Sequence, residues 1–173
     1  MRFFRKKLCQ GFTLIELLVV IAIIGILSGV ILQTVNSARQ KAMIIAAKEE
    51  ARNLSNAMMM MVDDTEEWPG HQKVFEINQE GANEICSDGC TFGLSDGRAG
   101  LVSTDGNYQN WKGPYIKSIP LDPWGHEYFF DTDYDIDPGA GQKWVAAVGS
   151  YGPNGEGNNL YDSDDVIYVI TSQ

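Results

Sequence analysis

The chain has 173 residues, enough for one domain with a modest core, and apolar residues make up 44% of it. Its formal net charge is −10. Four basic residues and no acid fall in the first eleven positions, so the remainder carries 9 basic against 23 acidic residues, a net charge of −14. A body this acidic repels phosphate backbones, which disfavours direct nucleic-acid binding and suits divalent cations or a basic partner.

The N-terminal segment combines a short basic stretch with a long apolar one. Residues 1–11 contain Arg and Lys, whereas Phe12–Leu32 contain a single charged residue, Glu16. As a helix, this apolar stretch would span roughly 30 Å, the thickness of the hydrocarbon core of a bilayer. The basic flank predicts that the N-terminus stays cytoplasmic. A cleaved secretory signal is the alternative, but Gln33–Arg39 offers no clean small-x-small cleavage site.

The helical pattern continues beyond the apolar span and becomes amphipathic over residues 33–62. Apolar residues recur there at spacings of three and four, charged residues fill the other face, and no Pro interrupts the pattern. We therefore expect one continuous helix of about 50 residues, with its amphipathic half packed against a globular head. The helix should end by Asp63–Asp64, and Trp68-Pro69 prevents its resumption.

The remainder of the chain, residues 63–173, has the composition of a small globular head. Gly, Asp, Asn and Pro are frequent, and aromatic and β-branched residues come in short runs. Strands are expected at Glu127–Asp131, Trp144–Val148 and Val166–Thr171, and a short helix around Val74–Ile77. Short connections favour antiparallel pairing. The expected fold class is α+β, a long N-terminal helix packed against a small antiparallel C-terminal sheet.

The junction of the basic and apolar stretches, GFTLIEL at Gly11–Leu17, resembles the processing site of type IV pilins and type II secretion pseudopilins. The resemblance implies that residues 1–11 are a prepilin leader peptide. A prepilin peptidase would cut between Gly11 and Phe12, and the new Phe12 amine would be methylated. The fifth mature residue of the family is a glutamate, here Glu16, and a carboxylate inside a bilayer is costly and usually functional. We expect Glu16 to pair with the Phe12 amine of a neighbouring subunit; the alternative is that it only reaches the lipid headgroups.

Two C-terminal stretches extend the resemblance to the major pseudopilins of type II secretion systems. Pro120–Gly125 resembles their DPWG stretch, and Gly149–Gly155 with Asp162–Val166 resembles their calcium-binding loop. Calcium takes six to eight oxygens from carboxylates, amides and carbonyls on a flexible turn. The side chains that could supply them are Ser150, Asn154, Asp162, Asp164 and Asp165. The alternative is a solvated acidic loop without a metal.

Two other motifs are interpreted as structure. The acidic run Asp131–Asp137 begins like an EF-hand loop, but Ile136 stands where that loop needs glycine and the closing glutamate is missing. We interpret it as a charged hairpin connection. Gly93–Gly97 fits G-x-S-x-G, but a nucleophile elbow needs a strand before the serine and a helix after it. Turn residues surround this motif, His126 is the only histidine downstream, and His71 has no evident partner, so we expect no enzyme.

The cysteines divide between the leader and the head. Cys9 lies in residues 1–11, so cleavage would leave two, Cys86 and Cys90, in a polar CSDGC stretch. This even count fits a small disulfide loop in an oxidising compartment. A zinc site is disfavoured because two thiolates without a nearby His are too few ligands. Redox catalysis is disfavoured because its motif has two intervening residues, where this chain has three.

The resemblance implies a structural subunit of a helical filament, most closely the major pseudopilin of a type II secretion system, which drives protein export. A major or minor pilin of a surface type IV pilus, serving adhesion or motility, is the alternative, and a membrane-anchored enzyme or binding protein is a more distant one. The implied partners are other copies of the chain, a prepilin peptidase, an inner-membrane assembly platform and minor pilins or pseudopilins. The implied location is the bacterial inner membrane, crossed once, with the head periplasmic and the assembled filament periplasmic or extracellular.

Overall fold

The computed structural model describes residues 12–74, 85–86, 92–137, 139, 141, 143–156 and 162–172. The chain divides into two compact units, Met1–Lys41 and Ala42–Gln173. The described part of the first unit is helical from Leu14 onward, and the second holds the rest of that helix, the strands and the loops.

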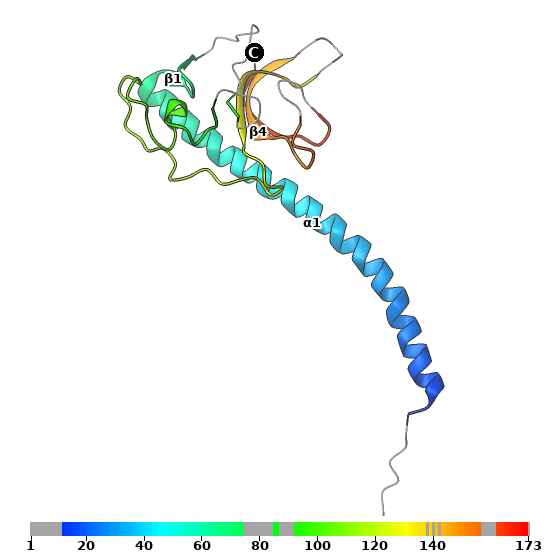
Figure 1. Ribbon diagram of the computed structural model, residues 1–173. Coiled ribbons are helices and arrows are strands. Elements are labelled where there is room, and N and C mark those ends of the chain that lie inside the picture. The colour runs from blue at the N-terminus through cyan, green and yellow to red at the C-terminus, as the bar shows by residue number, and fades with distance from the viewer. Residues whose placement is uncertain are drawn as a thin grey trace, which may run out of the picture. The chain divides into compact units, whose positions relative to one another are not determined.

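One helix, α1, runs without a break from Leu14 to Thr65, as the amphipathic pattern and the absence of Pro predict (Figure 1). It ends one residue beyond the predicted Asp63–Asp64. The stop is made by Glu66, whose φ of 60° is left-handed and whose N–H donates to the carbonyl of Val62 at 2.8 Å. The hydroxyl of Thr65 also donates to the carbonyl of Met61 at 2.8 Å, so the end of the helix is capped.

Within the second unit, one face of α1 packs into the hydrophobic core. Ala51, Leu54, Met58 and Met61 follow the three- and four-residue spacing and are fully buried. They pack in one cluster with residues from the loops and strands, including Trp68, Leu94, Leu101, Tyr128, Phe130 and Val148. Met59 and Met60, between the buried methionines, are exposed. The prediction that the amphipathic half of the helix packs against the head is thus confirmed.

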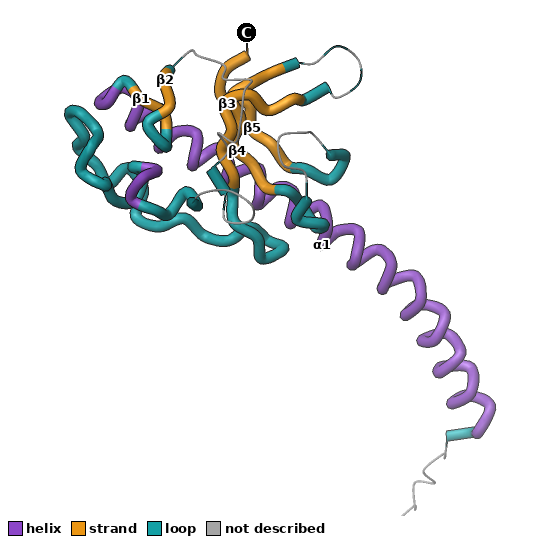
Figure 2. The backbone as a smooth tube through the Cα atoms, turned by 45° about the horizontal axis from the view of Figure 1, so that its top comes forward, coloured by secondary structure: helices purple, strands orange, loops and turns teal. Residues whose placement is uncertain are grey.

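The strands form two antiparallel sheets (Figure 2). The larger has the order β3-β4-β5 and is built from Phe129–Asp135, Trp144–Ser150 and Val166–Ser172. The smaller is a hairpin of β1, Glu67–Trp68, and β2, Gln72–Lys73. In the part of the chain that the structure describes, one 3-10 turn, η1, covers Gly97–Ala99.

The antiparallel sheet and the positions of β4 and β5 confirm the predicted α+β class. The first strand was predicted at Glu127–Asp131 but begins and ends later, at Phe129–Asp135. The hairpin and η1 were not predicted. The expected short helix at Val74–Ile77 lies outside the described residues except for Val74.

The interpretation of Asp131–Asp137 as a charged hairpin connection is wrong for most of the run. Asp131, Asp133 and Asp135 lie in β3 and are almost completely buried. A register shift between Asp131 and Tyr134 marks a bulge, where the carboxylate of Asp131 accepts the Asp133 N–H at 2.9 Å. The Asp135 carboxylate accepts the N–H groups of Asp137 and Lys143 at 3.0 and 2.9 Å. These bonds to the backbone let carboxylates replace the usual apolar strand residues.

Candidate functional site

The N-terminal candidate site begins where the helix begins. Gly11, one side of the predicted cleavage, lies outside the described residues, and Phe12, on the other side, is 79% exposed. The Glu16 carboxylate accepts the N–H of Thr13 at 2.8 Å and its hydroxyl hydrogen at 2.7 Å, and the Glu16 N–H donates back to the Thr13 hydroxyl at 3.3 Å. This is a capping box, in which Thr13 is the N-cap and Glu16 the third helical residue. The T-x-x-E spacing in the sequence is the pattern typical of such a box, which is not among the predictions above.

The capping box uses one oxygen of Glu16. The partner in all three hydrogen bonds is Thr13. The two bonds to the carboxylate both go to Oε2, and the third is donated by the Glu16 N–H. Oε1 makes no hydrogen bond to any described residue. A carboxylate oxygen with a positive group nearby forms a short, strong bond, so Oε1 is chemically suited to accept a bond from an amine while Oε2 caps its own helix.

The first unit exposes its apolar side chains. From Phe12 to Val35 every large apolar residue whose side chain is described is exposed. By length and composition, α1 is the one helix among the described residues able to cross a membrane, and its most apolar stretch is not buried within the protein. Such a surface needs lipid or the apolar helices of other molecules around it.

The predicted calcium ligands lie on two loops of the second unit. The side-chain amide of Asn154 donates to the carboxylate of Asp162 at 3.1 Å and to that of Asp164 at 2.9 Å. The backbone N–H of Asn154 donates to Asp164 at 3.2 Å. A hydrogen bond from the N–H of Ser163 is the main reason why the pKa of Asp162 is below its usual value, so that group is ionised at neutral pH.

Asp165 is the buried member of the group. One of its oxygens, Oδ2, accepts the hydroxyl hydrogen of Tyr134 and the Asp162 N–H, the latter at 2.7 Å. The other, Oδ1, is buried and has no hydrogen-bond partner among the described residues. Desolvation raises the pKa of Asp165 to about 6, although the bonds from Tyr134 and Asp162 oppose it. A buried carboxylate oxygen without a donor is costly, so this oxygen is a position where a positive or hydrogen-bonding group would stabilise the fold.

The oxygen donors of this group are of the chemical type that a hard cation binds. Asp162, Asp164 and Asp165 would supply carboxylate oxygens, and a calcium ion would take the rest of its shell from backbone carbonyls and water. Among the described residues, no three His, Cys, Asp or Glu side chains converge as a ready-made metal centre, so side chains alone do not complete the shell. The Asn154 amide, bridging two carboxylates, supplies the partial positive charge there. The hydroxyl of Ser150 is engaged elsewhere, because it donates to Asp122 and accepts the Gly152 N–H.

A turn not predicted as part of the site supports this loop. The Asp122 carboxylate, 5% exposed, accepts the N–H groups of Trp124 and His126 at 2.9 and 2.8 Å. The His126 ring nitrogen Nδ1 lies 3.0 Å from the Gly152 carbonyl oxygen. A β-carbon built on Gly155 would lie 3.0 Å from two atoms of the same ring, so the loop packs closely against it. The DPWG stretch thus fixes the backbone of the 150–155 loop.

Of the two head cysteines, Cys86 is described and Cys90 is not. Cys86 is 2% exposed and packs in a second core cluster with Phe129, Tyr134, Val145, Ala147 and Tyr151. The Cys86–Cys90 disulfide therefore stays a prediction.

The G-x-S-x-G motif does not form a nucleophile elbow. Ser95 lies in a turn, and the residue after it, Asp96, caps the 3-10 turn η1 by accepting the Arg98 N–H at 2.9 Å. No strand precedes Ser95 in the described segment that begins at residue 92, and η1 is too short to be the helix that such an elbow needs.

The comparisons with known proteins agree at both ends of the chain. Residues 6–32 match the family model for the prokaryotic N-terminal methylation motif, and residues 94–168 match that for protein G of the type II secretion system. Type II secretion system core protein G of Pseudomonas aeruginosa is 29% identical over 162 residues, 91% of this chain and 95% of that protein. Core protein G of Escherichia coli K12 is 29% identical over 85% of this chain and 83% of the relative.

A solved structure is also similar. The major pseudopilin from the type 2 secretion system of enterohaemorrhagic Escherichia coli is 21% identical, with a TM-score of 0.47 over 76% of this chain and 86% of that one. The two family models and the curated relatives carry the assignment. The chain thus combines a match to the N-terminal methylation motif with a match to the protein G domain, and it resembles type II secretion system core protein G over most of its length.

Proposed function

We propose that this chain is the major pseudopilin of a type II secretion system, the repeating subunit of a helical filament that drives protein export. One observation carries the proposal. An N-terminal methylation motif opens an exposed apolar helix in the same chain whose C-terminal domain matches protein G. The helix supplies a surface for membrane and filament, and the domain identifies the branch of the family.

Assembly is proposed to depend on Phe12 and Glu16. A prepilin peptidase removes residues 1–11, and the Phe12 amine, once methylated, is a positive group at the start of the apolar span. The Oε1 of Glu16, which bonds to no described residue, accepts a bond in the filament from the Phe12 amine of a neighbouring subunit. Two charges that would each be unpaired in an apolar environment are then paired, which fixes the register between subunits. Contacts between apolar helices supply most of the association free energy.

The topology and partners follow from the same proposal. Before assembly the subunit crosses the inner membrane once, with its basic N-terminus in the cytoplasm and its head in the periplasm. Its partners are other copies of the chain, the prepilin peptidase, an inner-membrane assembly platform and minor pseudopilins. The acidic head, part of a mature chain with a net charge of −14, suits a cation or a basic partner better than nucleic acid.

The head is further proposed to bind one calcium ion. The support comes from the buried, unpartnered Oδ1 of Asp165 and from the carboxylates of Asp162 and Asp164 that meet at Asn154. A bound calcium would offset the repulsion among these carboxylates. It would thereby hold the loop before β5 against the turn at residues 150–155.

The experiment that tests the assembly proposal compares three variants of the full chain in membranes that contain the secretion machinery. Glu16→Ala makes the span more apolar, so insertion and cleavage should be unchanged, with mass spectrometry showing a methylated Phe12. Filaments should be absent by electron microscopy. Thr13→Ala is the matched control, because it removes the capping partner of Glu16 but leaves the carboxylate. It should assemble.

Three outcomes would oppose the proposal. Normal filaments from Glu16→Ala at normal subunit level would remove Glu16 from assembly. Loss of filaments from Thr13→Ala as well as from Glu16→Ala would show that helix capping, and not pairing, is what the carboxylate supplies. Long surface fibres in place of short periplasmic ones would assign the unmodified chain to a type IV pilus.

A further inference from the structure

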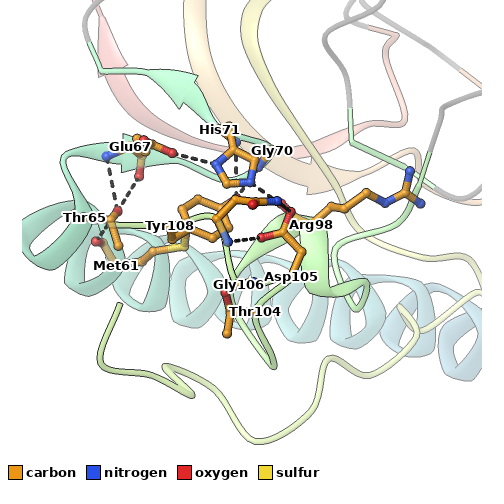
Figure 3. Close-up of polar contacts among 11 residues, drawn as sticks. Met61, Thr65, Glu67, Gly70, His71, Arg98, Thr104, Asp105, Gly106 and Tyr108 are labelled. Atoms are coloured by element: carbon orange, nitrogen blue, oxygen red, sulfur yellow. Dashed lines mark hydrogen bonds and ion pairs between the residues drawn. The ribbon is translucent and has the colours of Figure 1, made fainter. Parts of the chain in front are cut away.

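His71 lies between two carboxylates at the turn of the β1–β2 hairpin (Figure 3). Its Nδ1 is 2.7 Å from an oxygen of Glu67, and its Nε2 is 3.2 Å from an oxygen of Asp105. Ionised carboxylates only accept hydrogen bonds, so both ring nitrogens must carry a hydrogen for both bonds to form. The geometry therefore requires the imidazolium form of His71.

The same histidine is joined to the loop that follows η1. Its ring stacks on Tyr108 with centroids 3.9 Å apart and planes at 22°. The Tyr108 hydroxyl accepts the N–H groups of Gly70 and His71 at 2.9 and 3.2 Å and donates to the carbonyl of Arg98 at 2.6 Å. Figure 3 shows these bonds converging on the tyrosine from the hairpin and from η1. Two segments far apart in the sequence are thus fastened at one point.

Two basic residues, Arg98 and Lys73, lie on the segments next to His71. The Arg98 guanidinium pairs with Asp96 at 2.9 Å and points away from the imidazole (Figure 3). Lys73 is the cross-strand neighbour of Glu67 and is exposed. Partial burial lowers the pKa of His71, but the bonds to Glu67 and Asp105 outweigh it, so the pKa is raised above the usual 6.5.

The backbone conformation of the turn is one that the contacts of His71 help to hold. His71 has a φ of 59° and Gly70 a φ of 76°, so two consecutive residues are left-handed. Glycine adopts this conformation at no cost, whereas histidine does not. The hairpin has independent anchors elsewhere, because Trp68 is buried in ring contact with Phe130. Loss of the His71 contacts would therefore loosen the turn and not the whole hairpin.

We propose that His71 is a pH-sensitive clamp, which fastens the hairpin turn to the Asp105–Tyr108 loop when protonated and releases it as the pH rises. Below pH 6.5 the imidazolium is present in both the folded and unfolded chain, and the clamp contributes fully. As the pH rises through the folded-state pKa, above 6.5, one ring nitrogen loses its hydrogen and presents a lone pair to a carboxylate. The clamp lies outside the assembly and cation sites and is independent of the proposed function.

The test uses the full chain in detergent micelles with ring-labelled histidine. The chain has two histidines, so NMR resolves His71 and His126 directly, and His71→Gln assigns the signals. The His71 titration midpoint should lie above 6.5. Hydrogen exchange at the N–H groups of Gly70 and His71, corrected for its intrinsic pH dependence, should become faster as the pH passes that midpoint. The expected increase is about tenfold for each unit by which the His71 midpoint exceeds 6.5.

Charge-removing variants that leave the ring in place make the test decisive. Glu67→Gln and Asp105→Asn should each lower the His71 midpoint and reduce the exchange step. Asp63→Asn, an exposed charge change on α1, is the matched control and should leave both unchanged. A His71 midpoint at or below 6.5, or exchange at Gly70 and His71 that shows no step through it, would overturn the clamp.

Discussion

The hydroxyl of Ser150 donates a hydrogen bond to the carboxylate of Asp122, a residue 28 positions earlier in the chain. The contact is buried and joins the end of β4 to the DPWG turn. Asp122 also holds that turn closed by accepting two backbone N–H groups, from Trp124 and His126. One carboxylate therefore joins the DPWG turn to the start of the 150–155 loop, one of the two segments that carry the candidate calcium ligands.

Replacing Asp122 by Ala should destabilise the head by about 3 kcal/mol, because three donors lose their acceptor in a buried place. Urea unfolding followed by tryptophan fluorescence measures this change. Ser150→Ala removes one of the three donors and should cost about 1 kcal/mol. Equal losses from the two variants would show that Asp122 does not act through the turn.

Calcium should raise the melting temperature of the full chain in detergent relative to chelator. Binding to the folded state alone stabilises by about 2.7 kcal/mol at a hundredfold excess over Kd, a rise of roughly 5–10 °C for a chain of this size. Asp164→Ala should abolish most of the rise, whereas Asp63→Ala, which removes an exposed carboxylate from α1, should preserve it. Magnesium should substitute poorly because it demands a tight octahedron. A melting temperature indifferent to calcium and chelator alike would leave the loop a solvated acidic surface.

Gly100 should tolerate no side chain, in contrast to Gly106. Both are left-handed, with φ of 78° and 90°, so alanine at either position costs about 1 kcal/mol in backbone conformation. A β-carbon at Gly100 would also lie 2.6 Å from the end of Met61 and 2.8 Å from the ring of Tyr108, whereas nothing lies within 4 Å at Gly106. Gly100→Ala should therefore lower the free energy of unfolding by about 1–3 kcal/mol more than Gly106→Ala does. Equal losses of unfolding free energy in the two variants, measured by urea unfolding, would mean that the Met61 side chain moves aside without an energetic cost.

Cys86 and Cys90 should form a disulfide in the mature protein purified without reductant. Closing so short a loop stabilises by about 2 kcal/mol, so reduction should lower stability slightly and leave the fold intact. Alkylation followed by mass spectrometry counts the free thiols, and removal of Cys9 with residues 1–11 makes the count unambiguous. Two alkylated cysteines would contradict the prediction.

The sequence predicts well the parts of the fold that depend on periodic, local patterns. An apolar run continuing into an amphipathic one without Pro predicts α1, and the error at its end is one residue. The β-branched and aromatic runs beginning at Trp144 and Val166 predict β4 and β5. Each of these signals lies within the segment that folds, so no knowledge of distant contacts is needed.

What the sequence hides depends on contacts between distant segments. Asp131 and Asp133 look like a solvated connection, because alternating carboxylates are rare in a buried strand. His71 looks unpartnered because Asp105 is 34 residues away. Asp122 gains its role through Ser150 and through a turn that places its carboxylate inside. The Thr13–Glu16 capping box is the exception, since its signal is local and was overlooked beside the assembly role.

The exposed apolar surface from Phe12 to Val35 limits the route that a subunit can take. It includes fifteen large apolar side chains, each worth about 1.5–3 kcal/mol when shielded from water. A subunit that left the bilayer for open water would lose more than about 20 kcal/mol, far beyond thermal reach. In the proposed assembly, extraction would therefore be coupled to docking, with each helix exchanging lipid directly for protein neighbours. Growth of the proposed filament would then take place at its membrane-embedded end.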